Sequence, residues 1–137
     1  MMSKYPSREE IGQILKNSKV IAVVGLSADS SKTSYMVSKA MQDAGYKIIP
    51  VNPTVDTVLG EKAVPSLLDL KEKVDIVNVF RRPEHLLPVA EDFLKIDCDV
   101  FFAQLGIENE EAYELLKANG KTVIMNRCIK VEHAMTR

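Results

Sequence analysis

The chain alternates between two kinds of segment, and this alternation limits its fold more than any other feature. Short runs rich in β-branched residues occur at residues 20–24, 47–51, 75–80, 99–103 and 121–125. They are apolar almost throughout, as strands buried on both faces of a sheet are. Helical spacing occupies residues 33–44, 83–96 and 109–119, and a short helix is expected at 66–70. Strands that alternate with helices predict a parallel sheet with right-handed crossovers.

Local signals mark where several helices begin and end. Ser7 and Glu10 have the spacing of a capping box, so a helix is expected over residues 7–17. Gly45 and Gly120 follow two other helical segments as C-terminal stops. Within residues 33–44, the apolar side chains that share one face are Met36, Val37, Ala40, Met41 and Ala44.

These elements predict an α/β fold: a Rossmann-like, three-layer α/β/α arrangement with a five-stranded, mainly parallel sheet. The 137 residues fit a single domain, 1–137, and residues 7–17 are expected to pack on it as an N-terminal helix. Eighteen Lys and Arg against nineteen Asp and Glu give a net charge of −1. Such a balance argues against a protein that coats nucleic acid or an anionic membrane.

Other sequence signals point to a reduced, cytoplasmic protein. The two cysteines, Cys98 and Cys128, are too few for a disulfide framework. No signal peptide is visible, and the apolar run at residues 20–24 is far shorter than the ~20 residues of a spanning helix. A small-molecule partner is therefore expected, without nucleic acid or membrane, and a homodimer or a protein partner is left open.

The candidate site follows from the rule that ligands of open parallel sheets bind outside the carboxyl ends of the strands. The residues after the five strands are mostly small, polar or cationic: Gly25, Leu26 and Ser27; Asn52 and Pro53; Arg81, Arg82 and Pro83; Gln104, Leu105 and Gly106; Asn126, Arg127 and Cys128. A ligand-binding rim explains why one edge of the sheet carries all of them.

The loop after the first strand is the strongest local signal. Gly25 allows close approach of the backbone, and the helix at Thr33 offers its positive end to a phosphate. The alternative is an ordinary strand-to-helix turn, in which Ser and Gly are common and Asp29 caps the helix. The loop lacks the second glycine of a Walker A loop and two glycines of the dinucleotide fingerprint. Asn52 also replaces the acid that NAD-binding sheets carry after strand two.

The cationic rim residues each have two interpretations. Arg81 and Arg82 could bind phosphate or face Glu84 or Glu108, and Arg127 could meet a pyrophosphate or pair with Glu132.

No catalytic constellation is visible beside them. Cys128 follows a cation, which favours a reactive thiolate, although a free cysteine is more often a small apolar filler. Residues 129–135 are expected to pack over the rim, with His133 as a polar cap. Neither histidine indicates a metal site.

Several motifs together resemble the small stand-alone CoA-binding proteins, which are similar to the N-terminal domain of the succinyl-CoA synthetase alpha subunit. The motifs run in order past all five strand ends: VVGLS at 23–27, SY at 34–35, IPVNP at 49–53, LGEK at 59–62, VFRRPE at 79–84, QLG at 104–106 and MNRC at 125–128. The resemblance covers residues 11–133. It implies a Rossmann-like fold with coenzyme A or an acyl-CoA as ligand.

The resemblance also implies how the ligand would lie. The loop 25–27 with Ser34 and Tyr35 would hold the pyrophosphate, and Asn52 and Pro53 would lie near the adenosine. The residues at 81–83 would flank the nucleotide, while 104–106 and 126–128 would border the pantetheine arm.

The expected function is CoA binding without self-contained catalysis. The synthetase keeps its phosphorylated histidine in a further domain, which this sequence lacks, so ligase activity is not carried over. Two alternatives are an NAD(P)-binding redox or metabolite sensor and a subunit of an acyl-CoA ligase that needs a partner.

Overall fold

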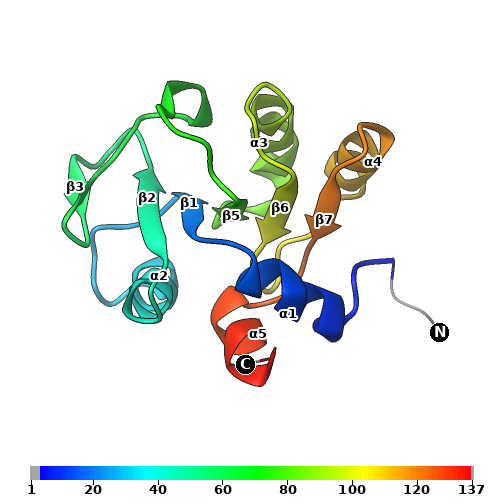
Figure 1. The fold of residues 1–137 in the computed structure, drawn as a ribbon. Helices are drawn as coiled ribbons and strands as arrows, with labels where there is room; N and C mark the ends of the chain where they lie inside the picture. Colours follow the sequence, from blue (N-terminus) through cyan, green and yellow to red (C-terminus); the bar gives the residue numbers. More distant parts are fainter. Residues whose placement is uncertain (1–3, 137) are drawn as a thin grey trace.

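The computed structural model describes residues 4–136, which form a five-stranded sheet with helices on both faces (Figure 1). The sheet strands are β1 (Val20–Val24), β2 (Lys47–Val51), β5 (Ile76–Val79), β6 (Val100–Ala103) and β7 (Thr122–Ile124). The α-helices are α1 (Arg8–Lys16), α2 (Thr33–Asp43), α3 (Leu86–Phe93), α4 (Glu110–Ala118) and α5 (Ile129–Thr136). Two short 3₁₀ helices, η1 (Leu67–Asp69) and η2 (Pro83–His85), and a hairpin of β3 (Thr57–Val58) and β4 (Glu61–Lys62) complete the fold.

The strands are ordered β2-β1-β5-β6-β7, and every pair in this sheet is parallel. In this sheet β1 therefore has β2 on one side and β5, β6 and β7 on the other. Val23 pairs with Pro50 of β2 on one side and with Asn78 of β5 on the other. Pro50 is tolerated because β2 is an edge strand of this sheet. The order creates a switch point at the carboxyl ends of β1 and β5, where ligands of such sheets bind. The predicted Rossmann-like α/β fold is confirmed, with a sheet that is wholly parallel.

Two apolar cores lie on the two faces of the sheet, because successive strand residues point in opposite directions. Ala22 and Val24 of β1 face the core that α3, α4 and η1 cover. Ile21 and Val23 face the core that α1, α2 and α5 cover. Figure 1 shows α3 and α4 on one side of the sheet and α1, α2 and α5 on the other.

The predicted helices are present, with instructive differences at their ends. The capping box of α1 forms: Ser7 Oγ accepts from the Glu10 N–H at 3.2 Å, and Glu10 Oε1 accepts from the Ser7 N–H at 3.1 Å. The expected helix at 83–96 divides into η2 and α3, which ends at Phe93. Pro88 lacks the N–H that would continue regular helical bonding back to Glu84, so the helix starts with a tighter turn.

Helix α2 is rotated from the predicted orientation. The side chains that it buries are Ser34, Val37, Ser38 and Met41, whereas Met36 is 51% exposed and Ala44 is also exposed. The spacing of the buried set is that of one helical face. Val37 and Met41 are buried as predicted, but a pattern of apolar residues does not include the two serines that complete this face.

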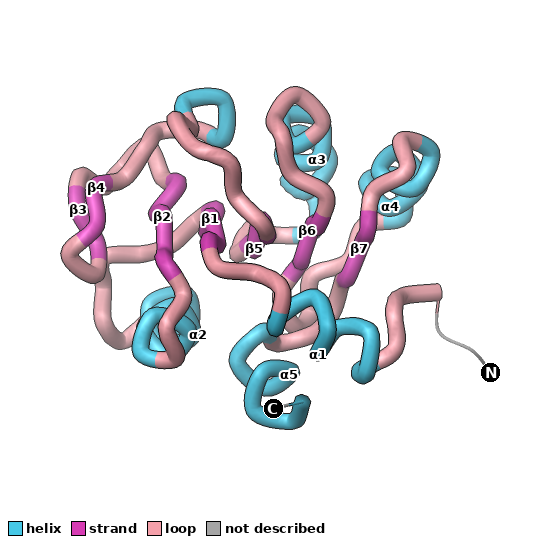
Figure 2. Tube along the Cα trace, viewed as in Figure 1, coloured by secondary structure: helices cyan, strands magenta, loops and turns pink. Residues whose placement is uncertain are grey.

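Two elements lie outside the sequence prediction. The β3–β4 hairpin turns through Leu59 and Gly60, which have φ of 55° and 76°, as a two-residue hairpin turn requires (Figure 2). The segment 129–135, expected to pack over the rim, instead forms helix α5, which packs against α1 and α2 on one face of the sheet. The buried Ile129 side chain anchors its first turn there. Among the described helices, none is long and apolar enough to cross a membrane.

Candidate functional site

The loop after β1 passes so close to the neighbouring strand that only glycine fits at its start. Gly25 has φ of 84°, and a Cβ built on it would lie 2.3 Å from the carbonyl oxygen of Phe80. Its N–H donates to the Val51 carbonyl at 2.9 Å. Gly25 thus holds the β1 loop against the carboxyl ends of both β2 and β5, at the switch point.

Beyond Gly25, the loop is shaped by its own serines. The Ser27 N–H donates to Ser34 Oγ at 3.0 Å, and Ser27 Oγ accepts from the Asp29 N–H at 3.0 Å. Asp29 Oδ1 accepts from both the hydroxyl and the N–H of Ser31, at 2.7 and 2.9 Å. These hydrogen bonds, that of the hydroxyl first, hold the pKa of Asp29 below its ordinary value. Asp29 therefore closes a turn within the loop, and the suggestion from the sequence that it caps the helix is wrong.

The N-terminus of α2 has no side-chain cap. Lys32 occupies the capping position in an extended conformation and makes no side-chain capping hydrogen bond. Ser34 lies in this turn with a 7% exposed side chain, and Tyr35 beside it is half-buried. Unpaired N–H groups at a helix N-terminus favour an anion.

The turn after β2 is tied to the β1 loop through Asn52. Its Nδ2 donates to the Leu26 carbonyl at 3.0 Å, while its Oδ1 accepts from the N–H and the hydroxyl of Thr54. Leu26 is fully buried as a whole residue, and its carbonyl is already bonded to Asn52, so the predicted contact of Leu26 with a ligand at the rim is not found in this structure. Beside this turn lies a cleft of about 170 Å³, with Pro53 and Arg81 in its lining.

The two arginines after β5 remain available to a ligand. Within residues 4–136, neither Arg81 nor Arg82 forms an ion pair, and the suggested pairing with Glu84 or Glu108 is not found. Arg81 Nε lies 3.6 Å from the position of a Cβ on Gly25, beside the β1 loop.

Pro83, which follows these arginines, opens η2. Its carbonyl accepts from Asn109 Nδ2 at 3.0 Å, which fixes the turn after the two arginines to the start of α4.

At the ends of β6 and β7, two amide side chains organise the backbone. Gln104 is 4% exposed, and its Oε1 accepts from the Ile129 N–H at 3.3 Å, at the start of α5. Asn126 has φ of 60°, and its Oδ1 accepts from the Gly106 N–H at 2.7 Å. Leu105 lies between these contacts with 67% of its surface exposed.

Arg127 takes the second of its two predicted roles, as a partner of Glu132. Its guanidinium lies 3.4 Å from Glu132 Oε2, and Arg8 binds the same carboxylate through two bonds of 3.0 and 3.1 Å. The Glu132 side chain is 3% exposed. Burial opposes its ionisation, but the two guanidiniums outweigh burial and lower the pKa of Glu132. The role of Arg8 had no sequence signal, because 124 residues separate it from Glu132.

Cys128 is half-buried beside this ion pair and packs against the core that contains Ile129. It is therefore neither fully buried filler nor a freely exposed thiol. Cys128, Arg127, Asn126 and Leu105 line one cleft of about 380 Å³. Among the described residues, no group of three His, Cys, Asp or Glu side chains could hold a metal.

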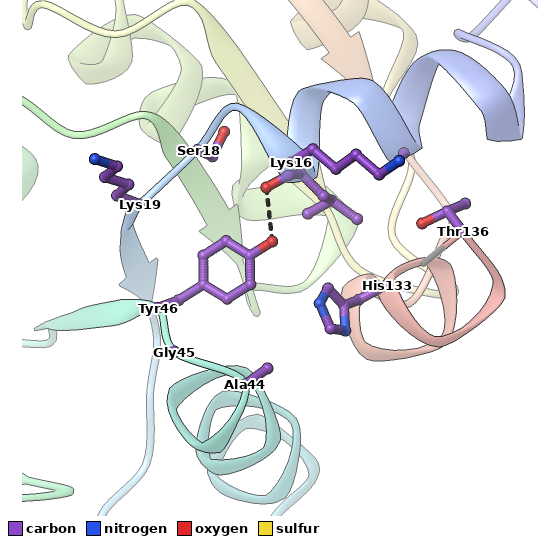
Figure 3. A pocket seen from close by; sticks show the side chains of 10 residues that line it. Lys16, Ser18, Lys19, Ala44, Gly45, Tyr46, His133 and Thr136 are labelled. Carbon is purple, nitrogen blue, oxygen red and sulfur yellow. Dashed lines mark hydrogen bonds between the residues drawn. The ribbon is translucent and has the colours of Figure 1, made fainter.

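A separate cleft of about 260 Å³ opens among α1, α5 and the turn before β2 (Figure 3). There the Tyr46 hydroxyl donates to the Leu15 carbonyl at 2.7 Å, and its ring meets His133 edge-on at 5.7 Å between centroids. Tyr46 precedes β2, so His133 lies toward the amino ends of the strands. The expectation that His133 caps the rim is therefore wrong, because α5 runs back along the face of the sheet.

The parallel sheet thus brings the residues after all five strands to one edge, where hydrogen bonds join the β1 loop to β2 and the β6 loop to β7. Leu26 and Gln104 are buried at this edge. The other residues that follow the strands have side chains or backbone groups that a ligand could reach. A parallel sheet with helices on both faces, and a glycine turn that leads into a helix at its switch point, places the chain in the Rossmann-like class of α/β domains.

Within that class the chain has a clear family. A family model described as a CoA binding domain matches residues 19–134, and the chain belongs to this family of CoA-binding domain proteins.

Three relatives show how this domain occurs elsewhere. The chain is 63% identical to "Uncharacterized protein YneT" of Bacillus subtilis (strain 168), over 96% of this chain and 98% of the relative. A Thermus thermophilus structure titled "cell-free ID.343" superposes with a TM-score of 0.92 at 36% identity, covering 96% of this chain and all of that one. An ADP-forming acetate–CoA ligase of Methanocaldococcus jannaschii is 34% identical over 61 residues, which are 44% of this chain and 9% of the ligase.

Proposed function

We propose that the chain binds coenzyme A or an acyl-CoA along the carboxyl-end rim, without catalytic machinery of its own. The observation that carries the proposal is the junction of the β1 loop with the uncapped N-terminus of α2. There only glycine fits where the backbone approaches β5, and the first-turn N–H groups of α2, which Lys32 does not cap, are suited to an anion. Membership of the CoA-binding domain family supports the pyrophosphate of CoA as this anion.

The loop chemistry refines which groups would meet the pyrophosphate. Because Ser34 Oγ already accepts the Ser27 N–H, the anion would use the N–H groups of the first turn of α2 and of neighbouring loop residues. Ser34 would then position the loop, and the buried Leu26 would fix the path of the loop through its bond to Asn52. Tyr35, half-buried in the same turn, would cover one side of the diphosphate.

The neighbouring strand ends would hold the rest of the ligand. Pro53 and Arg81 line the small cleft at the switch point, where we place the adenosine portion. The guanidiniums of Arg81 and Arg82, which form no ion pair within residues 4–136, suit phosphate groups, and Pro83 would flank the nucleotide.

The pantetheine arm would then cross the loops after β6 and β7. Gly106, Leu105 and Asn126 would border it, and it would end near Cys128. Gln104 is buried and would act indirectly, by fixing the start of α5 through its bond to Ile129.

Isothermal titration with CoA, dephospho-CoA, NADH and NADPH tests the proposal. We expect CoA to bind more tightly than either dinucleotide, and Arg81→Gln to weaken it at least tenfold. Lys71→Gln, an exposed residue with no ion pair among residues 4–136, serves as the matched control. Absence of CoA binding at millimolar concentration would contradict the proposal, and tighter NADH binding would favour an NAD(P) sensor.

The similarity to part of an acetate–CoA ligase favours a second candidate, a ligase subunit that depends on a partner. It predicts co-purification with an acyl-CoA ligase subunit and ligase activity only when the two proteins are mixed. CoA binding that persists without any activity in such mixtures would leave the binding module as the better account.

A further inference from the structure

The cleft at the ends of β6 and β7 has a feature that CoA binding alone does not require. Its volume of about 380 Å³ falls within the range of small-ligand pockets. Leu105, Met125, Cys128 and Val131 supply apolar surface, while the charged side chains in its lining are Arg8, Arg127 and Glu132. We call this cleft the arginine pocket.

The arginine pocket carries more positive than negative charge in its lining. Two guanidiniums share one carboxylate, which leaves one positive charge uncompensated. Glu132 is buried and its pKa is lowered, so it is ionised and already neutralises one of the two guanidinium charges. Glu108 accepts a hydrogen bond from the Tyr5 hydroxyl at 2.6 Å but does not line the pocket.

The two arginines are engaged to different degrees. Arg8 uses Nε and one terminal nitrogen in a two-bond contact with Glu132. Arg127 reaches the same carboxylate through one nitrogen at 3.4 Å, its single side-chain hydrogen bond within residues 4–136. A guanidinium has five N–H donors in a fork that matches a carboxylate. Most donors of Arg127 are therefore available, although its side chain is only 28% exposed.

The position of the pocket indicates what would use these donors. Leu105, Asn126 and Cys128 line it, and they are the residues along which we place the end of the pantetheine arm. An acyl group on the CoA sulfur would then enter the arginine pocket. A neutral acyl chain would meet its apolar wall but leave the spare donors of Arg127 unused.

We propose that the arginine pocket selects CoA thioesters whose short acyl group ends in a carboxylate, and that Arg127 is the residue that recognises it. This inference rests on the proposed function, because it takes the CoA sulfur to lie beside Cys128. It adds a ligand class: acyl groups of dicarboxylic acids.

Calorimetric titration with matched thioesters tests this selectivity. Malonyl-CoA and acetoacetyl-CoA differ by a terminal carboxylate in place of a methyl ketone, and succinyl-CoA extends the acidic acyl group by one carbon. We expect malonyl-CoA or succinyl-CoA to bind about tenfold more tightly than acetoacetyl-CoA, as a charge-assisted, two-bond contact provides.

Variants locate the effect. Arg127→Gln should reduce the preference to within about threefold, whatever it does to CoA itself, and Arg127→Lys should give an intermediate value because it keeps the charge without the fork. Lys130→Gln, which removes a nearby exposed cation that does not line the pocket, should leave the preference unchanged.

The outcomes separate this inference from the proposed function. If CoA itself does not bind, the proposed function fails and this inference fails with it. If CoA binds and the wild-type protein shows no preference for malonyl-CoA or succinyl-CoA, only the acyl selectivity is overturned. A preference that falls equally in Lys130→Gln and Arg127→Gln would also overturn it, because the cause would then be general positive charge.

Discussion

At the scale of single residues, Gly25 is the position where both the fold and the candidate site require a glycine. Its φ of 84° disfavours any side chain, and a Cβ would collide with the Phe80 carbonyl at 2.3 Å. That oxygen belongs to the backbone and cannot swing aside. The loop before α2 therefore depends on this glycine for its path as well as for access by a ligand.

We expect Gly25→Ala to lower the free energy of unfolding by roughly 3–5 kcal/mol, the sum of backbone strain and a steric clash. Gly120→Ala is the matched control, because Gly120 has φ of 74° but open space around it. It should cost only about 1–2 kcal/mol. Urea denaturation measures both values. Equal costs for the two variants would mean that the approach to Phe80 is not a constraint.

The two cysteines differ in their surroundings, and this difference predicts their chemistry. Cys98 is buried, and its Sγ lies 3.7 Å from the Val100 carbonyl. Burial raises the pKa of the Cys98 thiol to about 11. Cys128 is half-buried in the lining of the arginine pocket. Because the thiolate is the nucleophile, Cys98 should be inert near neutral pH.

We therefore expect CoA disulfide to modify Cys128 alone in the folded protein. The Cys128 thiolate would attack the disulfide, form a mixed disulfide with one CoA and release the other as its thiolate. Intact mass should show one adduct that dithiothreitol removes and that Cys128→Ser lacks. Glutathione disulfide, which has no nucleotide, should react at least tenfold more slowly if CoA binding guides the reaction. An adduct on Cys98 alone would contradict this placement of the CoA thiol.

At the scale of secondary structure, the strands were predictable from sequence and the C-terminal helix was not. Each buried parallel strand is a short apolar run between helical segments, so its ends were predicted within about a residue. Helix α5 holds its place through Ile129, which is buried under the sheet, and through Glu132, which binds Arg8. No local pattern reports contacts between residues so far apart in the chain.

The buried face of α2 shows a related limit. Ser34 and Ser38 are buried because the helix packs against the sheet there, and Ser34 also accepts the Ser27 N–H. A pattern of apolar residues indicates that a helix is amphipathic, but it does not reveal small polar residues in the packed face.

The contact between α1 and α5 predicts a dependence of stability on pH. The pKa of Glu132 is lowered, so its carboxylate stabilises the fold above its ordinary pKa of 4.5, and this contribution is lost as the pH falls through the lower folded value. Glu132→Gln should cost about 2 kcal/mol at pH 7, and its unfolding free energy should approach that of the wild type as the pH falls toward 3. Denaturation curves at several pH values measure the difference.

Glu114→Gln is the control for this experiment, because Glu114 is exposed on α4 and forms no ion pair within residues 4–136. Its effect should be small and nearly independent of pH. A cost of Glu132→Gln that stays constant from pH 7 to pH 3 would show that packing, and not charge, holds α5 to α1.

At the scale of the whole molecule, the sequence identified the edge of the sheet that carries the candidate site, because carboxyl ends of parallel strands must meet there. It did not reveal how each residue is used. Asn52 bonds Leu26 and Thr54, Gln104 bonds the start of α5, and Arg127 shares Glu132 with Arg8. Such roles depend on which side chains face one another after the chain has folded.

A ligand that spans the loops after all five strands should stabilise the whole fold, not one loop. A ligand that binds only the native state adds about 2.7 kcal/mol at a concentration one hundred times its Kd. For a chain of this size, that corresponds to a rise in Tm of about 10 °C. We expect CoA at that concentration to give a rise of this order in calorimetric unfolding.

The pattern across ligands then distinguishes a ligand that spans the rim from one that occupies part of it. At equal concentration, adenosine diphosphate should give a smaller rise than CoA, because it lacks the pantetheine arm that would reach β6 and β7. Pantetheine alone should give little, because it lacks the diphosphate that α2 would bind. Equal rises from CoA and adenosine diphosphate would confine the site to the loops of β1, β2 and β5 and would remove the basis for an acyl pocket beside Cys128.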